Sequence, residues 1–75
     1  MAEIDAEVLA QRLRFLRTEV LGLSIPAFCE KAGFSPSTYW SYMWQKHKPM
    51  ERVVRDIAKA VGVSAEWLMG LEEAE

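Results

Sequence analysis

The chain has 75 residues, of which 51% are hydrophobic and 27% charged, a composition typical of one small soluble domain rather than a disordered segment. Its single cysteine, Cys29, excludes both an intramolecular disulfide and a cysteine-rich metal site. The net charge is −2, and the sequence has neither an apolar stretch of about 18 residues nor a basic signal-peptide start, so we expect a cytoplasmic protein without membrane association.

Apolar residues at helical spacing predict five short helices with short links. In the first and longest helix, expected over residues 6–21, the apolar positions recur every three or four residues, at Leu9, Leu13, Leu16 and Val20. The other helices are expected over residues 25–32, 36–45, 50–61 and 65–69. Because no alternating strand pattern occurs, the predicted fold class is all-α.

Three of the four glycines open the same kind of tripeptide, glycine–apolar–serine, at residues 22–24, 33–35 and 62–64. Glycine tolerates the left-handed conformation that ends a helix, and a serine two residues later can cap the next one. The apolar residue between them can pack on the following helix as a hydrophobic staple. The sequence therefore predicts three helix–turn–helix junctions, with Ser24, Ser35 and Ser64 as N-caps.

Residues 25–44 carry a specifically spaced set of residues. Its members are Phe28 and Cys29 in mid helix, Gly33 in the turn, and Tyr39 and Tyr42 three apart in the second helix. This pattern resembles the helix-turn-helix of the lambda-repressor and Cro family, the Xre-type transcription regulators. Cys29 stands where the family has a small residue between the two helices, so it is expected to be a structural thiol.

The flanking segments extend this resemblance to about residues 9–71. Residues 12–17, Arg-Leu-Arg-Phe-Leu-Arg, are similar to the family's first helix, with one extra residue before Gly22. Residues 57–70 follow the family's usual ending. The resemblance implies one compact five-helix, lambda-repressor-like domain over residues 1–75. Its expected parts are a core over about 9–71, a helix-turn-helix over 25–44 and an acidic C-terminal tail over 71–75.

The resemblance implies a DNA-binding transcription regulator, phage or prophage repressor-like or Cro-like, that inserts helix 36–45 into the major groove of a double-stranded operator. The base-reading positions it assigns hold Ser35, Pro36, Ser37, Trp40, Ser41 and Trp44, with Gln45 at the edge. Apart from Gln45, none of these side chains can make a bidentate contact with adenine or guanine. Serine and tryptophan leave single hydrogen bonds and apolar contact with thymine methyl groups.

Helical geometry predicts an exposed aromatic pair. At 100° per residue, with Tyr39 facing the core, Ser41 and Trp44 point away from it together with Ser37, and Trp40 lies on the flank of that face. An exposed aromatic surface fits either DNA or a protein. The alternative function is therefore a protein–protein interaction module that docks a partner through Trp40 and Trp44.

Basic residues are concentrated in the middle of the chain. Residues 12–59 hold all nine basic residues and four acids, whereas the two ends hold seven acids and no base. This asymmetry is compatible with a polyanionic partner. Phosphate contacts are expected from Arg14, Arg17, Lys46 and Lys48. Simple solvation is the alternative for both arginines, and the acid that often pairs with the family's counterpart of Arg17 is replaced here by Met43.

A homodimer on DNA is expected through the fifth helix and the tail. The apolar residues assigned to this contact, partly shared with the core, are Trp67, Leu68, Met69 and Leu71. No enzymatic function is predicted, because the serines are explained as caps and every glycine ends a helix. His47 has no partner at metal-ligand spacing, so neither a metal nor another cofactor is expected.

Overall fold

A computed structural model describes residues 4–45 and 49–71. Its helical elements are α1 (Ala6–Phe15), η1 (Leu16–Val20), α2 (Ile25–Ala32), α3 (Pro36–Met43), α4 (Glu51–Val61) and α5 (Ala65–Leu68). Since η1 continues α1 without a break, the described residues form five helices and contain no strand. The predicted all-α, five-helix fold is confirmed.

The first helix contains a π-helical turn that the sequence pattern did not indicate. It begins at the N-cap Asp5, whose carboxylate accepts hydrogen bonds from the Glu7 and Val8 amides. In η1 the Leu21 amide donates to the Leu16 carbonyl five residues earlier, at 2.8 Å. A π-helical turn holds one residue more than an α-helical turn would. The extra residue before Gly22 is therefore accommodated inside the first helix, and the following junction keeps its spacing.

The predicted junctions are confirmed in their local geometry. The glycines that begin them all have positive φ, at Gly22, Gly33 and Gly62. Each following serine accepts a hydrogen bond from the backbone N–H three residues later, at 3.2–3.3 Å. A left-handed residue ends one helix and a serine begins the next, which makes the connections short.

Helix ends differ slightly from the expected ones. The third helix ends at Met43, because Trp44 leaves the helical region and Gln45 adopts φ +57°. The fourth begins at Glu51 after Met50 as N-cap, and the fifth ends at Leu68, one residue earlier than expected. The main consequence is that Gln45 does not lie on α3.

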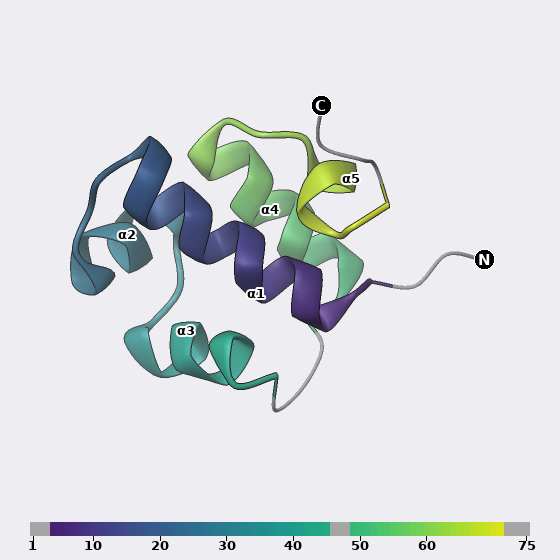
Figure 1. Cartoon of the computed structure of the whole chain (residues 1–75), viewed down its shortest axis with the longest axis horizontal. Coiled ribbons are helices and arrows are strands. Elements are labelled where there is room, and N and C mark those ends of the chain that lie inside the picture. The colour runs from purple at the N-terminus through teal and green to yellow at the C-terminus, as the bar shows by residue number, and fades with distance from the viewer. Residues whose placement is uncertain (1–3, 46–48, 72–75) are drawn as a thin grey trace.

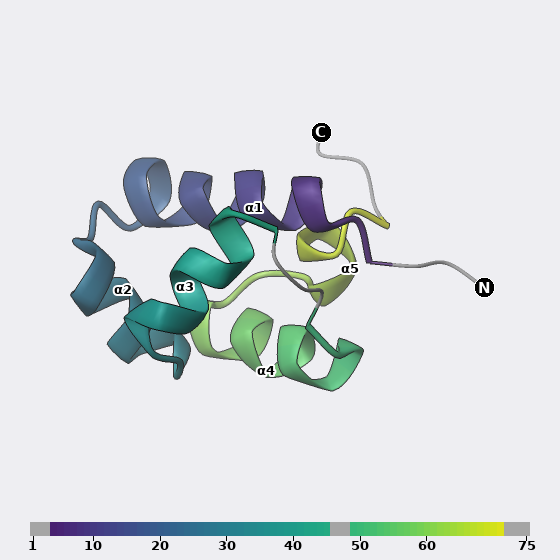
Figure 2. The same cartoon turned by 90° about the horizontal axis from the view of Figure 1, so that it is seen from below.

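One hydrophobic core joins all the helices. Fully buried side chains come from each of them, including Leu13, Phe28, Tyr39, Val54 and Leu68. In Figure 1, α1 crosses the molecule, with α4 and α5 on one side and α3 on the other. Figure 2 shows α1 along one edge and α4 along the opposite edge, with α3 running across the front. The outer face of α3 is thereby left uncovered beside α1.

Candidate nucleic-acid interface

The third helix separates an aromatic core face from an uncharged outer face. On the inner side Tyr39 and Tyr42 are buried, as predicted, and their rings contact Phe34 at centroid distances of 6.5 and 5.7 Å. Phe34 precedes the N-cap Ser35, so it acts as the expected staple. No residue of α3 is charged, so helix 36–43 presents hydroxyl, aromatic and other apolar groups to its surroundings.

Two tryptophans dominate the outer face at α3, Trp40 on the helix and Trp44 at its C-cap. Trp40 is 40% exposed and Trp44 64% exposed, which confirms the predicted exposure of Trp44. Their ring centroids lie 5.5 Å apart, with the planes tilted by 34°. Ser37 is exposed beside them and Ser41 is half-buried. Large apolar surfaces left in contact with water on a small domain are a feature of binding faces.

A groove of about 490 Å³ separates this face from the first helix. It is lined by Glu7, Ala10, Gln11, Arg14, Arg17, Tyr39, Trp40, Met43, Trp44 and Gln45. The fold therefore brings together five residues predicted as DNA contacts, two of them arginines from the first helix. Glu7 and Gln11 were not predicted as site residues. Their spacing relative to Arg14, seven and three residues along one helix, was the available signal.

Arg17 is bound to α3 through the phenol of Tyr39. Its Nε donates a hydrogen bond to the Tyr39 hydroxyl at 3.0 Å, and its Nη1 donates to the Leu23 carbonyl at 3.1 Å. The guanidinium also lies 5.8 Å from the centre of the Tyr39 ring. An acid at position 43 is thus unnecessary, because Tyr39, one helical turn earlier, supplies the acceptor. Three contacts hold the Arg17 side chain, which comes from η1, against α3 and the turn that follows η1.

Arg14 is placed differently from Arg17. Its side chain is exposed at the groove and makes no hydrogen bond or ion pair with any described residue. An unpaired guanidinium is available for a charge-assisted hydrogen bond to phosphate. The two arginines therefore differ in role. The Arg14 guanidinium is accessible to a ligand in the groove, whereas Arg17 holds α3 in position.

Three of the other residues predicted to contact DNA, Ser35, Pro36 and Gln45, lie at or near the two ends of α3. The Ser35 Oγ accepts a hydrogen bond from the Thr38 amide at 3.2 Å and lies 3.1 Å from the Thr38 hydroxyl, so it is engaged as a cap. Pro36 is exposed at the first position of α3. Gln45 is exposed beyond the helix end. Lys46 and Lys48 lie outside the described residues.

Cys29 is buried where α2 faces the core, in agreement with the expected structural role. Burial raises the pKa of its thiol, and the positive charge of Arg17 opposes this effect only in part. A thiol with a raised pKa is a weak nucleophile at neutral pH.

The fifth helix is held against the first by Arg12. Its guanidinium lies 4.9 Å from the centre of the Trp67 ring and donates a hydrogen bond to the Trp67 carbonyl. Phe15 packs edge-on against the same ring at 6.5 Å. Leu68 and Met69 are 0% and 1% exposed, so the expectation that they contribute to a dimer contact is wrong. Both fill the core, and only Trp67 and Leu71 retain surface for a partner.

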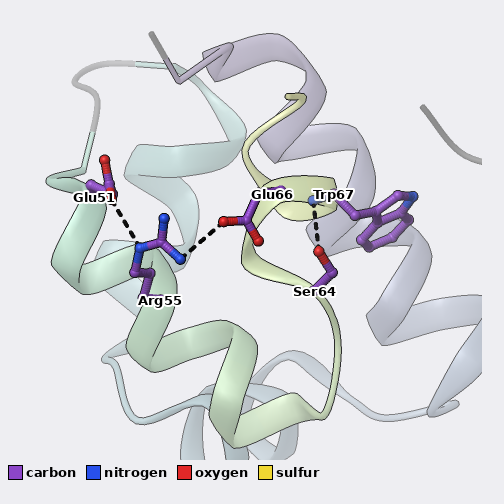
Figure 3. Close-up of polar contacts among 5 residues, drawn as sticks. All are labelled: Glu51, Arg55, Ser64, Glu66 and Trp67. Atoms are coloured by element: carbon purple, nitrogen blue, oxygen red, sulfur yellow. Dashed lines mark hydrogen bonds and ion pairs between the residues drawn. The ribbon is translucent and has the colours of Figure 1, made fainter. Parts of the chain in front are cut away.

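A surface ion-pair network joins α4 to α5 (Figure 3). Arg55 lies between two carboxylates, with Nε 2.9 Å from the Glu51 Oε2 and Nη1 3.1 Å from the Glu66 Oε2. The pKa of Glu66 is lowered, first by a hydrogen bond from its own backbone N–H and second by its interaction with Arg55. These groups are solvent-exposed, so their contribution to stability is small. The network lies on α4 and α5, outside the groove between α1 and α3.

Within residues 4–45 and 49–71, no three histidine, cysteine or acidic side chains gather at metal-binding distance. None of the described helices has the length and apolarity needed to cross a membrane.

Comparisons with known proteins agree with this architecture. A family model described as a helix-turn-helix domain matches residues 8–71. Among solved structures, the chain is similar to the crystal structure of a hypothetical transcription factor, NHTF, from Neisseria, with a TM-score of 0.75 and 22% sequence identity. The similarity covers 92% of this chain and 84% of that one, and at this identity it shows the fold. A search of curated proteins found no match.

Proposed function

The chain belongs to the helix-turn-helix domain family, and from this premise we propose that it is a DNA-binding transcription regulator. Membership also confirms the Xre-like resemblance read from the sequence. The finer proposal is a phage or prophage repressor-like or Cro-like protein that inserts α3 into the major groove of its operator, in the cytoplasm of a bacterium.

One observation carries this proposal: the uncharged outer face of α3 is exposed next to Arg14, whose side chain has no hydrogen-bond or ion-pair partner among the described residues. A recognition helix needs a face free of acids, since the groove it enters is lined by phosphates. The α3 helix has no acid, and Arg14 lies across the groove beside it. Arg14 is therefore assigned to the DNA backbone, and Arg17 to holding α3 in place.

Two lysines after α3 in the sequence complete the proposed backbone contacts. Lys46 and Lys48 come three and five residues after the end of α3 in the sequence and add two positive charges there. Because contacts with phosphate carry no sequence information, these residues would contribute affinity for all duplexes alike.

A homodimer on DNA is part of the proposal. Each subunit would place one α3 helix in one half-site, about 34–36 Å from the other. The exposed parts of Trp67 and Leu71, with Phe15 beside Trp67, are the apolar surface assigned to this contact.

The aromatic pair also supports a second function. Trp40 and Trp44 are the residue type most enriched at the energetic centres of protein interfaces. The alternative is a protein–protein interaction module in which the groove between α1 and α3 receives a partner instead of DNA.

The decisive experiment is a mobility-shift titration with DNA from upstream of the protein's own gene at two salt concentrations. Wild type should bind, with affinity falling as salt rises, because each neutralised phosphate releases counterions. Arg14→Ala should weaken binding to all sequences and reduce the salt slope by about one unit, as should Lys48→Ala.

Lys59→Ala is the charge-matched control, because Lys59 is exposed on α4 outside the groove. It should leave the slope unchanged. No salt-dependent binding by wild type to any duplex would contradict the DNA-binding proposal. Loss of a captured partner on Trp44→Ala would then favour the protein-binding alternative.

A further inference from the structure

The outer face of α3 has an unusual chemistry for reading DNA. Its largest surfaces are the adjacent indole rings of Trp40 and Trp44, one helical turn apart. The polar groups beside them are the single hydroxyls of Ser37 and Ser41. Gln45, the remaining polar candidate, lies past the helix end in a left-handed conformation.

These groups restrict which features of a base pair the helix can recognise. Guanine and adenine are usually selected by paired hydrogen bonds from arginine, lysine, asparagine or glutamine, and α3 has none of these residues. In the major groove the one apolar group is the C5-methyl of thymine. The apolar surface of an exposed indole is complementary to that methyl, whereas its Nε1–H supplies only a single hydrogen bond, which does not by itself select one base.

We propose that Trp40 and Trp44 read thymine bases in the operator by burying their C5-methyl groups. The inference rests on the DNA-binding function proposed above and specifies its sequence preference. Charge favours DNA over an apolar protein partner as the occupant of this face. Among the described residues, Arg14 and Arg17 line the adjacent groove together with one acid, Glu7.

The spacing of the two rings predicts the spacing of the bases. Their centroids lie 5.5 Å apart, whereas successive bases on one strand rise by about 3.4 Å. The two indoles therefore span between one and two base steps. We expect the selected thymines to be adjacent or separated by one base pair.

The test removes the methyl group and leaves base pairing intact. A duplex selected by the wild-type protein from a randomised pool is synthesised with deoxyuridine in place of each thymidine in turn. At the contacted positions wild type should lose about fourfold in affinity per methyl, the factor that corresponds to about 0.8 kcal/mol for one buried carbon group. At one of these positions Trp44→Ala should bind the thymidine duplex and the deoxyuridine duplex with equal affinity. Trp40→Ala should do so at the other position.

Two further variants separate methyl recognition from general damage. Trp44→Phe keeps an apolar ring and should retain sensitivity to deoxyuridine. Met50→Ala removes a side chain of matched exposure, 62% against 64% for Trp44, from outside α3 and should behave as wild type. Circular dichroism of each variant verifies that the helices remain folded.

The outcomes distinguish this inference from the function on which it rests. Salt-dependent binding that is unaffected by deoxyuridine at every position overturns methyl readout and leaves DNA binding in place. Deoxyuridine sensitivity that survives in both tryptophan-to-alanine variants overturns the assignment to these residues. Absence of salt-dependent binding to any selected duplex removes the proposed function and this inference together.

Discussion

At the scale of single residues, the side chain of Tyr39 joins two roles. Its ring packs in the core against Phe28 at 6.0 Å, and its hydroxyl accepts the hydrogen bond from Arg17. The hydroxyl therefore lets a half-buried guanidinium lie beside the core without an acid as partner. Because Arg17 also bonds the Leu23 carbonyl, one residue fixes α3 relative to the turn that follows η1.

Tyr39→Phe tests this role without changing the ring. Loss of the acceptor should lower the free energy of unfolding by about 0.5–1.5 kcal/mol, the usual contribution of one hydrogen bond, measured by urea denaturation. Tyr42→Phe is the matched control, because the Tyr42 hydroxyl has no hydrogen-bond partner among the described residues. Equal stability of wild type and Tyr39→Phe would show that the Arg17 contact is energetically neutral.

At the scale of the helices, glycines in left-handed conformations set where the chain turns. Gly33 and Gly70 have similar φ values of +86° and +80° but different surroundings. A Cβ at Gly33 would meet no atom within 4 Å, whereas one at Gly70 would lie 3.1 Å from the Cβ atoms of Asp5 and Val8. Gly70 thus also permits the close approach of the chain after α5 to the start of α1.

The two glycines should therefore differ in their response to alanine. Gly33→Ala should cost about 1–2 kcal/mol, the penalty for a left-handed residue with a side chain. Gly70→Ala should cost more, because the added methyl also crowds α1. Thermal unfolding of both variants under identical conditions measures the difference. A Gly70→Ala protein as stable as Gly33→Ala would mean that the start of α1 can move away from the added methyl group without a loss of stability.

At the scale of the whole molecule, the two flanks of α1 carry different surfaces. One flank forms the groove with α3, and the other packs Phe15 and Arg12 against Trp67. The proposed DNA face and the proposed dimer contact therefore do not compete for the same residues. A subunit can use both at once.

The dimer proposal predicts two chains per operator duplex in sedimentation of the complex. Leu71→Ser should weaken cooperative binding, because it removes exposed apolar surface near Trp67. Val20→Ser, a comparable change at an exposed apolar position of η1, should have no such effect. A complex that contains one chain per duplex would contradict the proposal.

The sequence by itself determined the helices, their junctions and the inward or outward direction of the α3 side chains. These features depend on local physics: glycine φ preference, serine capping, and the 3.6-residue period that placed Tyr39 inside and Trp44 outside. The sequence also showed Leu68 and Met69 to be apolar, but it did not separate core contacts from surface contacts for them. That distinction depends on how α5 packs against its neighbours.

Only the tertiary structure decided the contacts between distant segments. It paired Arg17 with Tyr39, 22 residues away, and Arg12 with Trp67, 55 residues away. It also formed the groove from one side of α1 and the tryptophans of α3. Each contact requires two helices to meet at a particular angle, which is set by packing of the shared core rather than by either segment's own sequence.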